Sequence, residues 1–412
     1  MNKLGSEFLK PFSDYDRPVF GSLTKRQLVM MIGVVLGGIA ITTVIILGLP
    51  DIFMYLSGGI IVPPFVIYGM KKDIEIKEKI CYICLLRKSR YMIKSRICEM
   101  LGIEYPVFQG GMAWIADASL AAAVSDAGGL GLITSVNTGT EAVREQVRKC
   151  REMTDRPFGV NIMLQAPNAA EVAAMIVEEG VKVVTTGAGS PVQYMQMWKE
   201  AGIKVIPVVP SVAIALKMQA AGADAVVAEG AESGGHIGEL HTMPLIPQVA
   251  DALDIPVIAA GGICDGRGAA AAFMLGADAV QVGTRFLSAK ECNIHPDYKD
   301  KIIKATDIST IVTGKSFGHP VRSLKTPFSK TLARMEADPS VDHDQMLALG
   351  SGALRRAVQE GSIDGSYMAG ECAGMVKTIE SARTIVEDII LGAEKIIVHV
   401  YNTRLLTNDN TK

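Results

Sequence analysis

The chain has 412 residues, with 41 basic and 43 acidic side chains and a formal net charge of −2. This balance gives no reason to expect nucleic acid as a partner, and the length suggests two or three domains. The seven cysteines are scattered, and Cys81-x-x-Cys84 has no second pair with which to complete a four-ligand metal site. We therefore expect free thiols, no disulfide framework and no metal centre.

The N-terminal part of the chain contains two uncharged apolar runs, Leu28 to Leu49 and Ile52 to Met70. Each is close to the ~20 residues that a helix needs to cross a bilayer. Lys25-Arg26 precede the runs and Lys71-Lys72 follow them, so the positive-inside rule places both ends in the cytoplasm. We predict a transmembrane hairpin within residues 1–72, with spans at about 28–49 and 52–70. A signal peptide fits less well, because the apolar core starts late and is doubled.

The polar lead PFSDYDRPVFGSLTKRQL, the two apolar runs and the basic stretch after them resemble the PrgI-type family of two-span membrane proteins from conjugative transfer systems. The resemblance covers residues 1–90 and implies a membrane part of a DNA-transfer channel, without catalytic residues. Residues 73–95 are charged and mixed, as expected of a linker beside anionic headgroups. Met92 stands just before a new pattern. The hairpin is therefore either fused to the following domain or separate from a protein that starts at Met92.

From Arg96 to about residue 395, apolar runs typical of buried strands alternate with amphipathic stretches typical of helices. The predicted strands are Pro106–Gln109, Leu130–Thr134, Phe158–Met163, Val181–Thr185, Lys204–Val208, Ala225–Ala228, Pro256–Ala259 and Ala279–Val282. The predicted helices between them include Asp117–Ala127, Thr140–Arg151, Ala169–Glu179, Val192–Ala201, Val212–Ala221 and Leu245–Leu253. Eight βα units predict a (β/α)8 TIM barrel, with a doubly wound open sheet as the alternative. A helix over 378–395 should pack on the barrel, and we expect residues 396–412 to form a partly disordered tail.

Glycines follow several of these strands, where the active sites of barrels lie. Strand seven ends in Gly261-Gly262 and strand eight in Gly283-Thr284, and glycine N–H groups with a following helix N-terminus would form a phosphate cradle. The other strand ends at the same mouth supply the remaining candidates for wrapping a phosphorylated planar cofactor, namely Gly110, Gly111, Met112, Asn161 and Glu229.

His236 directly follows two glycines in the stretch AVVAEGAESGGHIG at 225–238. Paired glycines suit a loop that a ligand approaches closely. An imidazole titrates near neutral pH, so His236 is the candidate catalytic residue. His319 is a second candidate, for which a structural or lid role is the alternative.

Five further motifs make a resemblance specific: YPVFQGGM, FGVNIML, AEGAESGGHIG, IAAGGICDGRGAAAAFMLGADAVQVGTRF and TGKSFGHPVRSLKT. Together with GSGALRRAVQEGSIDGSYMAGECAGMV they resemble, over about residues 94–394, the FabK-type enoyl-acyl-carrier-protein reductases, flavin enzymes related to the nitronate monooxygenases.

The resemblance implies bound FMN, with Gly110, Gly111 and Met112 along the flavin ring, Asn161 near its polar edge, and Gly261, Gly262, Gly283 and Thr284 at the phosphate. It implies a catalytic His236, NADH or NADPH as reductant, often a monovalent cation, and a substrate lid over 288–349. It also implies an enoyl-acyl carrier protein as partner, a homodimer and a cytoplasmic barrel, which the hairpin would tether to the membrane.

Two other functions stay open. Nitronate monooxygenase shares the barrel, the FMN and the histidine, whereas the triplet His236-Ile237-Gly238 and the GHPVR motif favour the reductase. A membrane component of a transfer channel, with a vestigial barrel, is the alternative from another class.

Overall fold

The computed structural model describes residues 18–20, 23–49, 62–64, 93, 95–135 and 139–404, in two units, Met1–Tyr91 and Met92–Lys412. Cys81, Cys84 and Met92 lie outside the described residues.

In the first unit, β1 (Pro18–Phe20) pairs with β2 (Leu23–Thr24) and α1 (Lys25–Ile46) follows. Within α1, Leu28–Ile46 has a mean hydropathy of 2.6, and most of its apolar side chains are exposed. Among the described residues, this is the helix long and apolar enough to cross a membrane. Of the second predicted span, only residues 62–64 are described, and they are helical.

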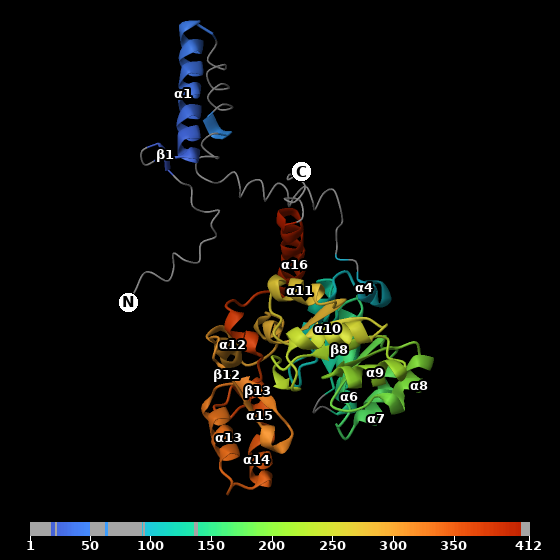
Figure 1. The fold of residues 1–412 in the computed structure, drawn as a ribbon. Coiled ribbons are helices and arrows are strands. Elements are labelled where there is room, and N and C mark those ends of the chain that lie inside the picture. The colour runs from blue at the N-terminus through green and yellow to red at the C-terminus, as the bar shows by residue number, and fades with distance from the viewer. Residues whose placement is uncertain are drawn as a thin grey trace. The chain divides into compact units, whose positions relative to one another are not determined.

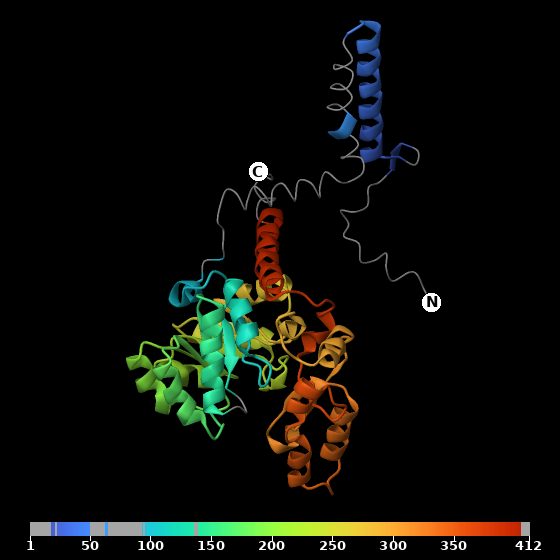
Figure 2. The ribbon, with the colours of Figure 1, turned by 180° about the vertical axis from the view of Figure 1, so that it is seen from behind.

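The second unit is built on an eight-stranded parallel sheet in the order β3-β11-β10-β8-β7-β6-β5-β4 (Figures 1 and 2). The two outer strands also meet: Gln109 N donates to Leu130 O at 3.0 Å and Leu130 N donates to Val107 O at 2.9 Å. These bonds close the sheet, so the predicted TIM barrel is confirmed and the open sheet is excluded. The strands are β3 (Val107–Gln109), β4 (Gly131–Thr134), β5 (Phe158–Met163), β6 (Val183–Gly187), β7 (Lys204–Val209), β8 (Val226–Glu229), β10 (Val257–Ala260) and β11 (Ala279–Val282).

Helices connect these strands and cover the outside of the barrel (Figure 1). They are α5 (Ala118–Asp126), α6 (Thr140–Met153), α7 (Ala169–Glu178), α8 (Val192–Glu200), α9 (Val212–Ala220), α10 (Thr242–Ala252) and α11 (Gly266–Met274). The bounds of the eight strands agree with the predicted bounds to within two residues. Among the helices, α10 begins at Thr242, three residues before the predicted start at Leu245. It begins earlier because the Glu232 carboxylate accepts hydrogen bonds from Thr242 N and Oγ1 and so caps the first turn.

The inside of the barrel is packed with apolar side chains from alternate strand positions, among them Phe108, Leu132 and Val227. The short helix α4 (Arg96–Leu101) adds Ile97 and Leu101 to this interior cluster. The Arg96 guanidinium holds α4 in place by pairing with the Asp278 carboxylate at 2.8 Å.

The segment after β11 forms a lobe that extends beyond the predicted lid, because the chain between 350 and 376 also belongs to it (Figure 1). Its sheet joins β12 (Thr310–Thr313) and β13 (Val321–Leu324) to β9 (Gly235–His236), which comes from the loop after β8. The other elements are η2 (Thr284–Ser288), α12 (Pro296–Ile303), η3 (Lys315–Phe317), α13 (Pro327–Ala337), α14 (His343–Gly350), α15 (Ala353–Arg355), η4 (Arg356–Glu360) and η5 (Glu371–Met375).

The last helix, α16, runs over Ala382–Arg404 and packs against α11 and α5. A partly disordered tail was expected from residue 396, but residues 396–404 continue the helix. The helix continues because Ile396 and Ile397 still pack against the core and neither proline nor glycine interrupts the stretch from Lys395 to Arg404.

Candidate active site

The inward positions of the strands change from apolar to polar at the carboxyl end of the barrel. Because side chains alternate between the two faces of a strand, the polar side chains at this end lie two residues beyond apolar residues of the barrel interior. Those apolar residues include Leu132, Val183, Val227 and Ala279. The polar residues are Thr134, Asn161, Thr185, Glu229 and Gln281, and the strand register aligns Thr134, Asn161 and Thr185 across neighbouring strands. Thr134, Thr185 and Gln281 were not among the predicted site residues, although the period of two within their strands could have identified them.

The structure brings the predicted residues Gly111 and Asn161 together. Asn161 is buried, and its Nδ2 donates to Thr185 Oγ1 at 2.8 Å. A Cβ atom on Gly111 would lie 2.2 Å from Asn161 Cγ, so only glycine fits beside this side chain.

The loop that follows Gly111 also approaches the end of β11. A Cβ atom on Gly283 would lie 3.8 Å from Met112 Sδ, so the loop after β3 and the loop after β11 are neighbours at the mouth. Trp114 in the first loop has a φ of 64°, a left-handed conformation that is costly for a tryptophan. Such local strain concentrates at functional sites, which supports the assignment of this loop to the site.

Gly261 and Gly262 fit the role of an anion cradle. Both take positive φ, 99° and 72°, and a Cβ atom on Gly261 would lie only 2.7 Å from Gly230 O. Their N–H groups donate to no acceptor recorded in the described part of the chain. Consecutive free N–H groups in such a turn form a concavity that binds phosphate.

One part of the expected cradle is wrong. The N-terminus of α11 was expected to contribute its positive end, but the Asp265 carboxylate caps it, accepting from Arg267 N at 2.9 Å and from Gly268 N at 3.3 Å. After β11, the 3₁₀ helix η2 takes the place of an α-helix. Thr284 Oγ1 there accepts from Gly370 N at 2.9 Å, and the Thr284 hydroxyl also hydrogen-bonds the Cys372 thiol. The donors that fit the phosphate of FMN are therefore the glycine amides, and Thr284 lies beside them.

Glu229 is the titratable group of the polar layer. Burial raises the pKa of its carboxyl to about 7, and the nearby Ser233 hydroxyl opposes part of the shift. A carboxyl with such a pKa exchanges protons near neutral pH. The sequence assigned Glu229 to cofactor binding and gave no sign of this shift, which depends on the enclosing barrel.

His236 lies on β9, opposite Val321 of β13, and its side chain is exposed. The surrounding protein atoms partly remove water from the imidazole, and this desolvation lowers the pKa of His236. Electrostatic repulsion from the nearby His319 lowers it further. The structure thus places the two candidate histidines near each other, His236 on β9 and His319 in the turn that precedes β13. Its lowered pKa leaves His236 mainly neutral at pH 7.

Arg322 holds this sheet to the barrel. Its buried guanidinium donates from Nε and Nη2 to Ala231 O, at 3.2 and 3.0 Å, and pairs with the Glu371 carboxylate at 2.9 Å. Because Arg322 lies opposite Gly235 in the sheet, it positions the segment that carries His236. In the sequence, the GHPVR motif signalled only a resemblance, and the partners of its arginine could not be foreseen.

Comparisons with known proteins fit this architecture. A family described as "Nitronate monooxygenase" matches residues 94–392. A curated relative from Mycobacterium tuberculosis is 40% identical over 243 residues, 58% of this chain and 68% of the relative. It is named "(3aS,4S,5R,7aS)-5-hydroxy-7a-methyl-1-oxo-octahydro-1H-indene-4-carboxyl-CoA dehydrogenase". A "Probable nitronate monooxygenase" of Staphylococcus aureus is 32% identical over 343 residues, 72% of this chain and 96% of the relative.

Among solved structures, FabK from Thermotoga maritima is similar to this chain, with 47% sequence identity and a TM-score of 0.73. The match covers 75% of this chain and 99% of the FabK chain.

Proposed function

The chain belongs to the nitronate monooxygenase family, and from this premise we propose that it reduces 2-enoyl thioesters of acyl carrier protein to acyl thioesters, with NADH or NADPH as reductant. The family and the FabK neighbour indicate an FMN-dependent oxidoreductase. The substrate, the reductant, a bound monovalent cation and a homodimeric state belong to the proposal.

The mouth of the barrel supplies groups that suit each part of FMN. We assign Gly110, Gly111, Met112 and Asn161 to the ring, where only glycine fits beside Asn161. We assign Gly261 and Gly262, with their free N–H groups, and Gly283 and Thr284 to the phosphate. When bound, FMN supplies the hydride chemistry between the nicotinamide and the substrate.

The protein itself must stabilise negative charge on the thioester oxygen and deliver a proton to the α-carbon. We assign the first task to His236, because a neutral imidazole donates a hydrogen bond from its N–H group. Glu229, with a pKa of about 7, can hold a proton inside the mouth. Arg322 fixes the β8–β9 segment through Ala231 O and so keeps His236 at the mouth.

The observation that carries the reductase proposal is the 47% identity to FabK over a match that covers 99% of the FabK chain. The Mycobacterium tuberculosis relative, named as the dehydrogenase of a carboxyl-CoA, is further support, since CoA carboxyl derivatives are thioesters.

Nitronate oxidation is the second candidate function. The family description and the Staphylococcus aureus relative, 32% identical over 96% of its length, favour it. It would use the same glycines and the same histidine, so these residues do not distinguish the two functions.

We also propose that α1 and the predicted second span tether the barrel to the membrane from the cytoplasmic side. The support is the apolar helix Leu28–Ile46 with its exposed side chains.

The test uses the full-length protein purified in detergent. We expect flavin-dependent NADH loss with crotonyl-acyl carrier protein, and no oxygen uptake with a nitroalkane or its nitronate. Oxygen uptake with the nitronate and no thioester turnover would move the assignment to nitronate oxidation.

A further inference from the structure

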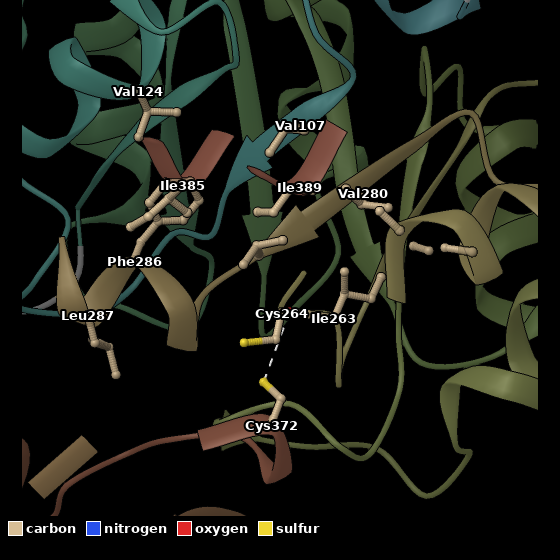
Figure 3. Close-up of a cluster of buried hydrophobic side chains, with 14 of the residues drawn as sticks. Val107, Val124, Ile263, Cys264, Val280, Phe286, Leu287, Cys372, Ile385 and Ile389 are labelled. Carbon is tan, nitrogen blue, oxygen red and sulfur yellow. Dashed lines mark hydrogen bonds between the residues drawn. The ribbon is translucent and has the colours of Figure 1, made fainter. Parts of the chain in front are cut away.

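Two buried cysteines face each other beside the glycine loop. Cys264 follows Gly261-Gly262-Ile263, and Cys372 lies in η5; the exposed fractions of the two residues are 2% and 7%. Both are free thiols. Their sulfur atoms point toward one another and share a hydrogen bond (Figure 3).

A hollow opens next to this pair. Its volume is about 370 Å³, and Cys372, Gly262, Ile263, Leu275 and Met375 are among its lining residues. A water-sized molecule needs only roughly 10–15 Å³ of such space, so a small solute can enter. Because Cys372 lines the hollow, such a solute can reach it even though the residue is buried.

We propose that Cys264 and Cys372 are a redox-active thiol pair, which a hydroperoxide that enters through this hollow oxidises to a disulfide. In the first step, the Cys372 thiolate attacks one peroxide oxygen, the O–O bond breaks, and hydroxide or alkoxide leaves and takes a proton. Cys372 is then a sulfenic acid. In the second step, the Cys264 sulfur attacks the Cys372 sulfur, the S–O bond breaks, and water leaves. With hydrogen peroxide, two thiols become one disulfide and one peroxide becomes two waters.

The surroundings favour this pair over the other described cysteines. Hydrogen bonds from Cys264 and Thr284 lower the pKa of the Cys372 thiol against the effect of burial, and the thiolate is the form that attacks peroxide. Burial raises the pKa of both Cys150 and Cys292 to about 12, so these two remain thiols.

The disulfide would join two elements that meet at the mouth. Cys264 continues the Gly261-Gly262 loop, whereas η5 begins beside Gly370, whose N–H group donates to Thr284. Neither thiol has a part in the proposed reaction, so the pair can be tested independently of the substrate.

The experiment treats the full-length flavin-loaded protein, in detergent, with a few equivalents of hydrogen peroxide. Free thiols are then alkylated under denaturing conditions, and the peptides are identified by mass spectrometry. We expect one cross-linked peptide pair containing Cys264 and Cys372, the loss of two alkylation sites, and full recovery of both after dithiothreitol. Peptide analysis separates these sites from Cys81 and Cys84.

Matched variants test the order of events. In Cys264→Ser, the sulfenic acid on Cys372 should persist and react with dimedone, whereas in Cys372→Ser the remaining Cys264 should stay alkylatable. Cys292→Ser removes a buried cysteine outside the pair and should leave the cross-link unchanged. The proposal is overturned if both thiols survive a peroxide dose that oxidises the exposed Met243, or if Cys372 becomes a sulfinic acid while Cys264 stays free.

Discussion

Replacing Glu229 with glutamine should remove a pH-dependent loss of stability. Folding raises the pKa of this carboxyl from 4.5 to about 7, so the folded protein binds the proton more tightly than the unfolded chain. Its stability therefore falls as the pH rises between these two values. Each pKa unit corresponds to about 1.4 kcal/mol, so the ionised side chain costs about 3 kcal/mol above pH ~8. Glu229→Gln keeps the shape of the side chain and stays neutral at every pH.

The assay is thermal unfolding of flavin-free full-length protein in detergent, followed over the pH range for both proteins. The two should unfold at similar temperatures below pH ~4, because the wild-type carboxyl is then mostly protonated in both states. Above pH ~8, the variant should unfold about 4 to 5 °C higher, given the entropy of unfolding of a unit the size of Met92–Lys412. A difference between the proteins that stays constant with pH would refute the reasoning.

Three further outcomes are expected. His236→Ala should lower the turnover of the enoyl thioester about 10²- to 10⁴-fold while flavin absorbance is retained, and turnover equal to that of the wild type would exclude His236 as a catalytic residue. Gly262→Ala should lose FMN on gel filtration whereas Gly180→Ala keeps it: the two glycines have similar φ, 72° and 63°, but a Cβ atom would have no neighbour within 4 Å at Gly180. Arg322→Ala should lower the free energy of unfolding by about 2–4 kcal/mol because Ala231 O loses its buried donors, and Arg322→Lys should recover only part of this; an unchanged melting temperature would contradict that role.

The barrel could be predicted from the sequence because its strands are buried on both faces. Such strands appear as short continuous apolar runs, so all eight were located from patterns such as Phe158–Met163. The length of α16 was missed because its later turns depend on contacts of Ile396 and Ile397 with the core, which no local pattern specifies.

The site was predictable only in part. The glycines at the strand ends marked the mouth, but the contact between Gly111 and Asn161 depends on barrel closure. The cap of α11 could have been noticed, since Asp265 directly precedes a helical stretch and aspartate is a preferred N-cap residue. The raised pKa of Glu229 and the contact between Cys264 and Cys372 arise from three-dimensional burial and pairing, for which the sequence holds no signal.

The most direct test of the proposed function is a single turnover without oxygen. Full-length protein is reduced with one equivalent of NADH until the visible flavin band is bleached, and is then mixed anaerobically with crotonyl-acyl carrier protein. The account predicts that the flavin band returns as butyryl-acyl carrier protein forms, and that it returns much more slowly in His236→Ala. A band that stays bleached with the thioester and returns only on admission of oxygen would contradict the proposed reductase.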